Sequence, residues 1–388
     1  MNKKLIRITT VPMSFKYLLK GQMNFMSKNG FNVTMISSDG QELNDVIENE
    51  KCAHIIIPLT RKITILKDLK ATYNLYKLIR KEKPDIVHTH TPKAGIIGML
   101  SSYFARVPIR LHTVAGLPLM EATGFKRIVL NLVEKLTYKC STKVYPNSYG
   151  LKKIILNHRF TSENKLKVIG KGSSNGIDTS YFNPELFSIE ENAVLKTNLG
   201  IKKTDLVFIF VGRIVSDKGI NELVEAFDKI CLVKENIKLL LVGPFEDELD
   251  PLQKRTKLLI NNNENIISVG YQNDVRPYFS ISNCLVFPSY REGFPNVVMQ
   301  AGAMKLPSIV SDINGCNEII ENNINGFIIK LKSVDAIYDA MIKITSDKSL
   351  FNKLRLNSRD SIKIKYEREV YWGLLLKEYE SIINKNLR

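Results

Sequence analysis

Long apolar runs, cysteine pairs and low-complexity tracts are all missing from this sequence. No apolar run approaches the roughly 18–20 residues that a membrane-spanning helix needs. The first apolar segment, Leu5–Val11, contains Arg7 and stops at Pro12, so it predicts a β-strand and not the core of a signal peptide. The five cysteines form no CxxC pair. Their odd number and wide spacing indicate reduced, mostly buried thiols in a cytoplasmic protein without a zinc site.

The composition is that of an ordinary soluble protein, with 44% hydrophobic and 24% charged residues. A chain of 388 residues exceeds one typical core, so two domains of roughly 180–200 residues are expected. The first half carries the whole net charge of +17. Residues 1–180 hold 29 Lys and Arg against 12 Asp and Glu, whereas residues 181–388 hold 27 of each kind. This asymmetry predicts a polyanionic partner, either nucleic acid or an anionic membrane surface.

Strand-like and helix-like segments alternate along the chain, which predicts parallel sheets covered by helices on both faces. The turn-rich segment 170–184 separates two rounds of this alternation and is interpreted as an interdomain linker. The predicted fold class is α/β, with two doubly wound Rossmann-like domains and ligand sites at the C-terminal edges of both sheets. The predicted strands are 5–11, 31–37, 52–58, 84–90, 109–114 and 143–146, then 206–211, 239–242, 266–269, 285–287, 308–310 and 326–329.

Helical periodicity is clear in three further segments. A single helix is expected over Lys16–Lys28, ending at the turn Asn29-Gly30. The segment Leu66–Lys81 has apolar residues at helical spacing. The highly charged segment Ser349–Leu387 is expected to be helical as well.

Two loops of the second domain follow predicted strands and would meet at one sheet edge. In the first, Gly212 allows a close approach of the backbone, and Arg213 and Lys218 supply two cations before a helix N-terminus. This combination suits a diphosphate, and it matches neither a Walker loop nor GxGxxG, which disfavours NTP hydrolysis and NAD. In the second, Val269–Asp274, the backbone could pair with a base and Tyr271 could support a ring. Plain solvated turns are the alternative for both loops.

A third loop joins the strand at 284–287 to a helix that begins near Pro295, and it contains Glu292. A carboxylate beside the free amides of a helix N-terminus can hold a polyhydroxylated, anionic ligand. An ordinary connection with a solvated Glu is the alternative. The amides in question are those of Gly293, Phe294, Asn296 and Val297.

In the first domain, candidate side chains lie mostly just after predicted strands. Because side chains alternate between the two faces of a strand, only one of His88 and His90 is expected to face a site. A zinc pair is disfavoured because no third ligand follows at a recognisable spacing. For each histidine a structural role is the alternative. The candidates are His88, His90, Lys93, Gly95, His112, Gly116, Lys126 and Arg127.

Several short motifs extend these loops: Gly212-Arg213, Lys218-Gly219, Val269-Gly270, Pro288-Ser289, Glu292-Gly-Phe-Pro-Asn296, Ser311-Asp312, Gly315, Glu318 and Asn325-Gly-Phe327. Together they resemble the GT4-type family of retaining glycosyltransferases, which have the GT-B fold. The likeness covers essentially the whole chain and is most specific from about 205 to 330. Within the family, the chain is most similar in character to bacterial enzymes that extend sugars on undecaprenyl diphosphate for capsule, O-antigen or protein glycans.

The resemblance implies a donor site for a UDP-sugar and a retaining transfer of a hexose or HexNAc. Arg213 and Lys218 would bind the diphosphate and stabilise the departing nucleotide. Glu292 would hydrogen-bond the sugar hydroxyls, His112 would lie near the anomeric carbon, and the backbone around Tyr271 would read uracil. The further donor contacts implied are Gly212, Gly270, Gly293, Phe294, Pro295, Asn296 and Val297.

One position departs from the family pattern of two glutamates eight residues apart. The second is Gln300 here, which can still contact the ribose but carries no charge, so a mechanism with two carboxylates is disfavoured. No cofactor and no metal is expected, because there is no DxD motif, and the acidic run Glu246–Asp250 is interpreted as a solvated loop. Retention would follow from front-face attack, with the leaving phosphate oxygen as the base and Arg213 and Lys218 receiving its charge.

The resemblance also assigns roles to the domains. Residues 1–180 would bind the acceptor, residues 181–370 would bind the nucleotide sugar, and residues 371–388 would form a helix crossing back to the N-terminal domain. A lipid-linked saccharide at an anionic membrane surface would account for the basic first half, including the cluster Arg61-Lys62. We expect a cytoplasmic enzyme, peripheral on the inner face of the bacterial membrane. The weak candidates for acceptor contacts are Lys93, Gly116, Lys126 and Arg127.

Three other functions stay open from the sequence. A nucleic-acid-binding protein would use the charge, but no aromatic platform accompanies the basic residues and no RRM, HTH or zinc signature is present, so no nucleic-acid partner is expected. A GT-B-fold epimerase would isomerise UDP-HexNAc without any acceptor. A glycosyltransferase of the same family could instead use a soluble sugar acceptor.

Overall fold

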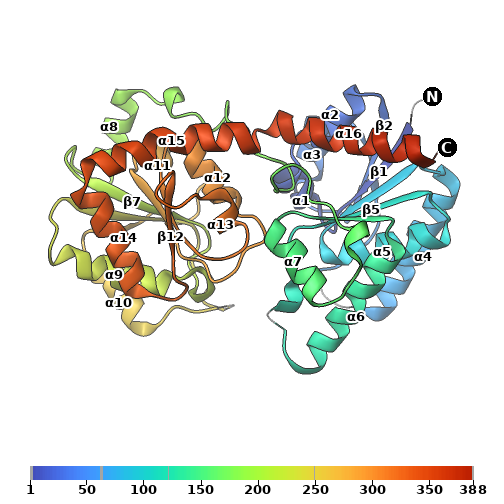
Figure 1. Ribbon diagram of the computed structural model, residues 1–388, viewed down its shortest axis with the longest axis horizontal. Coiled ribbons are helices and arrows are strands. Elements are labelled where there is room, and N and C mark those ends of the chain that lie inside the picture. Colours follow the sequence, from blue (N-terminus) through green and yellow to red (C-terminus); the bar gives the residue numbers. More distant parts are fainter. Residues whose placement is uncertain (1–2, 62–63, 121, 249, 387–388) are drawn as a thin grey trace. The chain divides into compact units, whose positions relative to one another are not determined.

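The computed structural model of the chain describes residues 3–61, 64–120, 122–248 and 250–386 (Figure 1). Lys62, part of the predicted basic cluster, and Leu249, part of the acidic run, lie outside the described residues. The chain divides into two compact units: the first comprises residues 1–176 and 368–388, and the second comprises residues 177–367. The sequence placed these boundaries near 180 and 370.

Each unit contains one parallel sheet of six strands, and both sheets have the same strand order. The order is β3-β2-β1-β4-β5-β6 in the first unit and β12-β11-β10-β7-β8-β9 in the second. In both, the order reverses between the first and fourth strands, which is where doubly wound sheets bind ligands. The strands are β1 (Lys3–Ile8), β2 (Phe31–Ser37), β3 (Ala53–Ile56), β4 (Ile86–His90), β5 (Ile109–Val114), β6 (Lys143–Pro146), β7 (Leu206–Val211), β8 (Ile237–Val242), β9 (Ile266–Ser268), β10 (Cys284–Phe287), β11 (Ser308–Ser311) and β12 (Gly326–Ile329).

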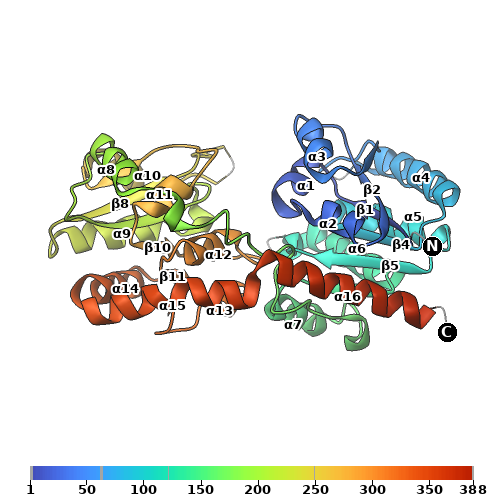
Figure 2. The ribbon, with the colours of Figure 1, turned by 90° about the horizontal axis from the view of Figure 1, so that it is seen from above.

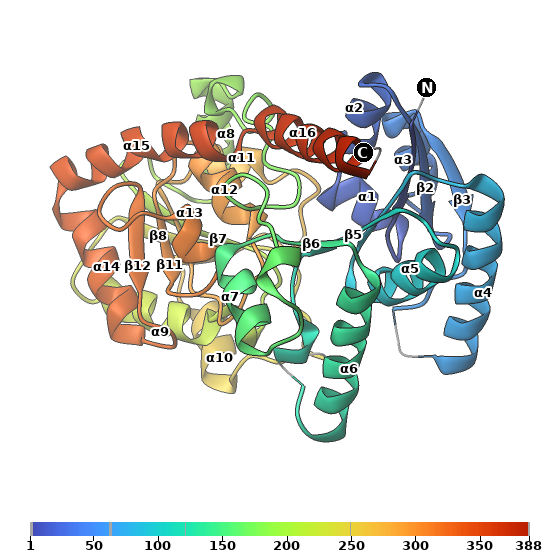
Figure 3. The ribbon, with the colours of Figure 1, turned by 45° about the vertical axis from the view of Figure 1, so that its right-hand side comes forward.

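Helices cover the sheets, and in the first unit α5 packs against both α4 and α6 (Figure 3). In the second unit α14 lies beside α15 (Figure 2). The helices of the first unit are α1 (Pro12–Leu18), α2 (Gln22–Lys28), α3 (Leu43–Glu50), α4 (Ile65–Glu82), α5 (Pro92–Phe104), α6 (Gly124–Cys140), α7 (Tyr149–Asn157) and α16 (Arg368–Asn386). Those of the second are α8 (Ile189–Asn198), α9 (Ile220–Cys231), α10 (Lys254–Asn262), α11 (Arg276–Ser280), α12 (Asn296–Ala303), α13 (Cys316–Ile319), α14 (Val334–Ser346) and α15 (Lys348–Tyr366).

The core of the first unit has two sides because successive residues of a strand point to opposite faces of the sheet. Leu5 of β1 packs into a cluster that also contains apolar residues of α1, α2, α3 and α16, whereas the next residue, Ile6, packs with α4 and α5. The second unit has one large core cluster that runs from Ile177 to Tyr366. The five cysteines are free, and all but Cys231 are buried.

The helix α16 belongs to the first unit although it follows the whole second unit in sequence. It contributes an apolar residue every four positions, namely Tyr371, Leu375, Tyr379 and Ile383, and all four are buried in the cluster with Leu5. Its Trp372 donates a hydrogen bond to Asn175 Oδ1 (2.6 Å). The apolar spacing therefore places this charged segment in the core of the first unit.

The single helix expected over Lys16–Lys28 is wrong, because the structure has two helices with a break at Gly21. This glycine has φ = +83°, a left-handed conformation that favours glycine. A Cβ atom at this position would lie 2.7 Å from the ring of Trp372. The break thus brings the chain close to α16, which the local pattern could not reveal.

The helix α4 forms as predicted, but the apolar residues in its first turns, Leu66 and Leu69, do not face the core. The buried residues are Ala71, Leu75 and Ile79. In contrast, Leu66 is 82% exposed, and Leu69 is exposed as well. An amphipathic helix normally buries its apolar stripe, so this outward stripe needs a separate explanation.

The expectation that only one of His88 and His90 could face a given site is also wrong. Residues two apart on a strand lie on the same face, and the two rings stack with their centroids 4.6 Å apart. Both are buried beside Arg7 and Tyr379. Burial and the charge of Arg7 hold the pKa of both histidines well below its usual value, so this pair is neutral and internal.

Candidate active site

The loops after β7 and β10 touch one another at the point where the second sheet reverses its strand order. A Cβ atom at Gly219 would lie 2.2 Å from the carbonyl oxygen of Pro288, and Tyr290 N donates to Asp217 O (2.9 Å). The loop after β9 is linked to the loop after β7 through Gly243, which follows β8. The N–H of Gly243 donates to the carbonyl of Gly270, and Gly243 fits tightly against Gly212. The three loops predicted to form a site therefore lie together at one sheet edge.

A short ion pair between the loops after β7 and β10 joins Lys218 to Glu292. Lys218 Nζ donates to Glu292 Oε1 at 2.5 Å, and both side chains are mostly buried. Ser289 Oγ, which is fully buried, donates to the same carboxylate oxygen (3.0 Å). Asn314 Nδ2 donates to the main-chain carbonyls of Glu292 and Gly293. The carboxylate is thus held by Lys218 and Ser289, and Asn314 holds the main chain of the same loop.

The N-terminus of α12 begins directly after this carboxylate. Phe294 and Pro295 are buried and precede the first helical residue, Asn296. Val297 and Gln300 are half-buried in the first turns of the helix. A helix N-terminus presents unpaired amides and a partial positive charge, so this edge can bind an anion and the hydroxyls attached to it.

The second cation of the site, Arg213, is paired with Glu246. Arg213 Nη1 donates to Glu246 Oε2 (2.9 Å), which leaves most of the donors of the guanidinium available. The acidic run at 246–250 also contacts the loop after β7, because Asp250 Oδ2 accepts a hydrogen bond from Asp217 N (2.6 Å). The interpretation of this run as a merely solvated loop is therefore wrong for Glu246 and Asp250, which contact the loop after β7.

In the loop after β9, Tyr271 is 63% exposed and its ring is open to a ligand, while the carbonyl of Gly270 already accepts one hydrogen bond from Gly243. Gln272 Nε2 closes the turn by donating to Val269 O (2.8 Å). The turn is therefore rigid at its base and presents an aromatic side chain at its tip.

In the first unit, His112 lies within the strand β5 and is 2% exposed. Its Nδ1 is 2.8 Å from Thr89 Oγ1, and its ring fits against Gly95, where a Cβ atom would lie 2.5 Å from Cε1. Burial lowers the pKa of His112 to about 4, so the imidazole is neutral at neutral pH. Gly116, further along the chain, borders open space.

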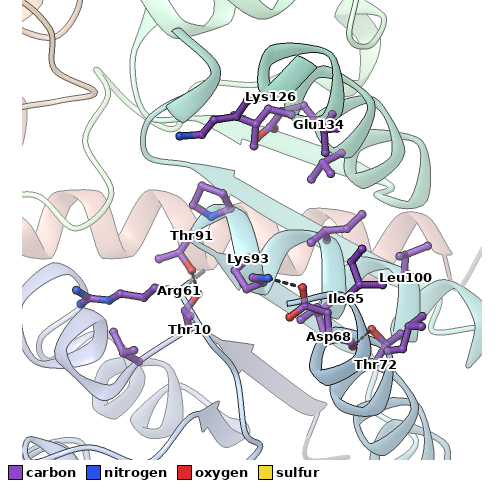
Figure 4. Close-up of a pocket in the computed structure, with 18 of the residues that line it drawn as sticks. Thr10, Arg61, Ile65, Asp68, Thr72, Thr91, Lys93, Leu100, Lys126 and Glu134 are labelled. Atoms are coloured by element: carbon purple, nitrogen blue, oxygen red, sulfur yellow. Dashed lines mark hydrogen bonds and ion pairs between the residues drawn. The ribbon is translucent and has the colours of Figure 1, made fainter. Parts of the chain in front are cut away.

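Lys93 and Lys126 line one cavity of the first unit (Figure 4). Arg127, the next residue of α6, is half-buried and is not among the residues that line it. Lys93 Nζ lies 2.5 Å from Asp68 Oδ2, so its charge is balanced by a carboxylate of α4. Lys126 is exposed at one end of the cavity. Of the four acceptor candidates, two are thus brought together by the fold.

Several residues of these sites were not assigned from the sequence. Ser289 and Asn314 lie within or beside quoted motifs, but only the structure shows that they hold the Glu292 loop. Glu246 was assigned to solvent because acidic runs usually are. Thr10 and Thr91, whose hydroxyl oxygens are 2.7 Å apart, follow β1 and β4 and mark the reversal point of the first sheet. The position of both threonines just after predicted strands was the feature of the sequence that could have indicated them.

Two family profiles match the chain over most of its length. Residues 192–361 match "Glycosyl transferases group 1", and residues 7–148 match "Glycosyl transferase 4-like". The chain is 35% identical over 387 residues to the capsular polysaccharide biosynthesis glycosyltransferase CapM of Staphylococcus aureus, covering 100% of this chain and 98% of that protein. It is 32% identical over 337 residues to an Escherichia coli protein named UDP-Gal:alpha-D-GlcNAc-diphosphoundecaprenol alpha-1,3-galactosyltransferase, covering 86% and 84%.

Solved structures share the fold at lower sequence identity. A glycosyltransferase from Rickettsia africae is similar with a TM-score of 0.80 and 21% identity, covering 98% of this chain and 99% of that one. Anabaena Alr3699/HepE, crystallised with UDP and glucose, gives 0.82 and 14%, covering 98% and 100%. The predicted pair of Rossmann-like sheets is confirmed, and with it the resemblance stated above. The chain belongs to the group 1, GT4-type family of glycosyltransferases and is an enzyme of sugar transfer.

Proposed function

We propose that this enzyme transfers a hexose or HexNAc from a UDP-sugar to a saccharide linked to undecaprenyl diphosphate during synthesis of a bacterial surface glycan. The names of the two relatives support this proposal, since one concerns capsular polysaccharide and the other a diphosphoundecaprenol acceptor. The Anabaena structure with UDP and glucose supports the donor class. The observation that carries the proposal is the Lys218–Glu292 pair at the N-terminus of α12, at the reversal point of the second sheet.

Each group of the donor site takes one part of the donor. Lys218 and Arg213 bind the diphosphate, since each keeps free N–H donors beside its carboxylate partner. Glu292 and the amides of Gly293 to Asn296 bind the sugar hydroxyls. Gln300 contacts the ribose, and the turn at Gly270 and Tyr271 receives the uracil ring, with Gly212 allowing close approach of the nucleotide.

The chemistry follows from charge placement. Cleavage of the anomeric C–O bond leaves its electron pair on the β-phosphate oxygen, where Arg213 and Lys218 stabilise the charge. The acceptor hydroxyl attacks from the same face and gives its proton to that leaving oxygen, so UDP departs and the configuration is retained. His112, neutral at the pH of the cytoplasm, is assigned as a hydrogen-bonding group near the anomeric carbon. No metal is required in this scheme.

The first unit binds the acceptor and the membrane surface in this proposal. It carries 33 Lys and Arg against 14 Asp and Glu, a net charge of +19, whereas the second unit carries 23 against 25. None of the described helices combines the length and apolar character that crossing a bilayer requires. We call the exposed apolar residues of α4 and α6 the apolar stripes: Leu66, Leu69 and Tyr73 on α4, and Phe125, Ile128, Leu132 and Leu136 on α6. They support peripheral binding to anionic lipid on the inner face of the cytoplasmic membrane, because each stripe is flanked by lysines. Lys93, Gly116, Lys126 and Arg127 are the acceptor contacts assigned.

The test is a transfer assay with the purified full-length chain. A panel of UDP-sugars is incubated with undecaprenyl-diphosphate saccharides, and the lipid-linked products are identified by mass spectrometry. Extension of a lipid-linked saccharide by one sugar with α-configuration is expected. Transfer only to water-soluble acceptors, or isomerisation of the UDP-sugar with no acceptor present, would contradict the proposal.

A further inference from the structure

A cavity lies within the first unit, between α4 and α6, with α5 as its floor. Its volume is about 870 Å³, near the upper end of the range of roughly 300–1,000 Å³ for ligand pockets. Figure 4 shows Arg61 and Lys126 at one end of this cavity, and Thr72 and Leu100 at the other. We call it the α4–α6 groove. All the residues that line it belong to the first unit.

One end of the groove can bind an anion. Thr10 and Thr91 lie there at the reversal point of the first sheet, and Thr91 directly precedes the thirteen-residue helix α5. Thr91 has φ = +72°, which is unfavourable for threonine. Arg61 and the exposed Lys126 add two cations to the N-terminus of α5.

Most of the remaining lining is apolar, with Ser14 and Thr72 as its uncharged polar residues. A chain of hydrocarbon therefore fits it better than a second nucleotide or a free saccharide. Among the described residues, the carboxyl groups that line it are Asp68, which pairs with Lys93, and Glu134, which is 6% exposed. The apolar residues are Ile65 and Leu69 from α4, Ile96, Ile97 and Leu100 from α5, and Val129, Leu130 and Val133 from α6.

The groove is continuous with an exposed apolar surface. On α4, Leu66 and Tyr73 point outward near the wall residues Ile65 and Leu69, which are themselves exposed. On α6, the exposed apolar residues are Phe125, Ile128, Leu132 and Leu136, spaced three or four positions apart. A lipid chain could therefore pass from a bilayer into the groove along apolar side chains and without crossing polar surface.

We propose that the α4–α6 groove holds the first isoprenoid units of the lipid-linked acceptor, with the acceptor's diphosphate between Arg61, Lys126 and the N-terminus of α5. The inference rests on the proposed function, since it assigns the lipid part of that acceptor to a site. A single-chain prenyl diphosphate fits this lining because one apolar channel ends in one cationic pocket.

Photo-cross-linking tests the site independently of catalysis. The probe is a farnesyl diphosphate analogue with a diazirine at the far end of its chain, used on the full chain in detergent. We expect labelled peptides from the groove walls on α5 and α6, with labelling reduced at least tenfold by undecaprenyl diphosphate and not by dodecanol. Labelling confined to the exposed stripes, or equal competition by dodecanol, would overturn the assignment.

A matched pair of variants tests the site in catalysis. Val133→Phe fills the groove, whereas Val194→Phe makes the same change at an exposed valine of α8 that does not line it. Each is assayed with an undecaprenyl-diphosphate saccharide and with the same saccharide diphosphate on a short alkyl chain. Val133→Phe should lower kcat/KM at least tenfold for the long chain only, and Val194→Phe should lower neither.

The outcomes separate this inference from the proposed function. Unchanged use of the long chain by Val133→Phe would remove the groove from the acceptor site while leaving the proposed function intact. Failure of the wild-type protein on every diphosphate acceptor would instead contradict the proposed function. Activity on the short-chain acceptor also shows that each variant has folded.

Discussion

Lys218 Nζ and Glu292 Oε1 lie 2.5 Å apart, although the two residues come from loops that follow different strands. The pair has two consequences for the donor site. It fixes the carboxylate at the N-terminus of α12, and it keeps the ammonium in place before any diphosphate arrives. Preorganised charges of this kind cost no rearrangement when negative charge develops on the leaving group.

Removing either cation of the donor site should slow the chemical step. Lys218→Ala and Arg213→Ala are each expected to lower kcat by about 100-fold, because loss of one charge-stabilising donor costs roughly 2.7–4 kcal/mol in a transition state. Steady-state rates with the identified UDP-sugar measure this. Lys229→Ala is the control, since Lys229 forms an exposed ion pair with Asp335 in the same unit. Rates for Lys218→Ala or Arg213→Ala close to those of the control would exclude the diphosphate role.

Restoring a carboxylate at position 300 should act on donor binding more than on chemistry. Gln300 is half-buried on α12, and Gln300→Glu would supply an acceptor for both ribose hydroxyls. We expect the donor Kd to change severalfold, with kcat altered less than twofold. Calorimetric titration with UDP and steady-state kinetics give the two quantities. A collapse of kcat at unchanged Kd would show that this position takes part in the reaction.

Glu134 should make the stability of the protein depend on pH. Burial raises the pKa of its carboxyl from 4.5 to about 7, and the nearby Tyr138 opposes this only in part. The folded state therefore holds a proton that the unfolded state releases, so stability falls as the pH rises from about 4.5 to 7. The loss approaches about 3 kcal/mol at 1.36 kcal/mol per pKa unit.

The matched variant for this effect is Glu134→Gln, which keeps the shape but cannot ionise. Urea unfolding of both proteins at pH 5, 6 and 8 should show the variant gaining stability over the wild type as the pH rises. The other charged groups lining the same groove, Arg61, Asp68, Lys93 and Lys126, are common to both proteins. A difference that is constant across this range would mean that Glu134 titrates normally.

The apolar stripes should govern binding to anionic vesicles. Phe125 is 80% exposed at the start of α6, and Phe125→Ser removes a side chain worth about 2 kcal/mol when buried in lipid, a factor of roughly 30 in partitioning. Flotation with phosphatidylglycerol vesicles measures the change, and binding should weaken further as salt screens the lysines. Phe245→Ser, an exposed phenylalanine of the second unit, is the control. Equal loss by both variants would place the membrane contact elsewhere.

The strands of this protein could be predicted from the sequence because buried parallel strands read as short apolar runs between turns. The ranges expected for β5, β6, β7 and β12 agree with the structure residue for residue. Placing the donor loops at one edge needed only the rule that loops after parallel strands gather at their C-terminal ends. The ion pairs between those loops depend on side-chain positions, which strand order does not determine.

The remaining differences come from contacts between segments that are distant in sequence. The break at Gly21 is set by the ring of Trp372, far along the chain, and no local pattern records it. The sequence also did not show which face of α4 packs against the sheet. Its buried face is Ala71, Leu75 and Ile79, and a periodic apolar pattern does not say which of two stripes meets the sheet.

The position of α16 ties the folding of the first unit to the order of synthesis. Tyr371, Leu375, Tyr379 and Ile383 complete one side of its core, yet they leave the ribosome only after residues 177–367 have been made. At roughly 5–20 residues per second, this is a wait of about 10–40 seconds. During that time the second unit can fold while the face around Leu5 and Met23 stays uncovered. The nascent first unit is therefore expected to bind a chaperone that shields apolar surface until α16 has been synthesised and covers this face.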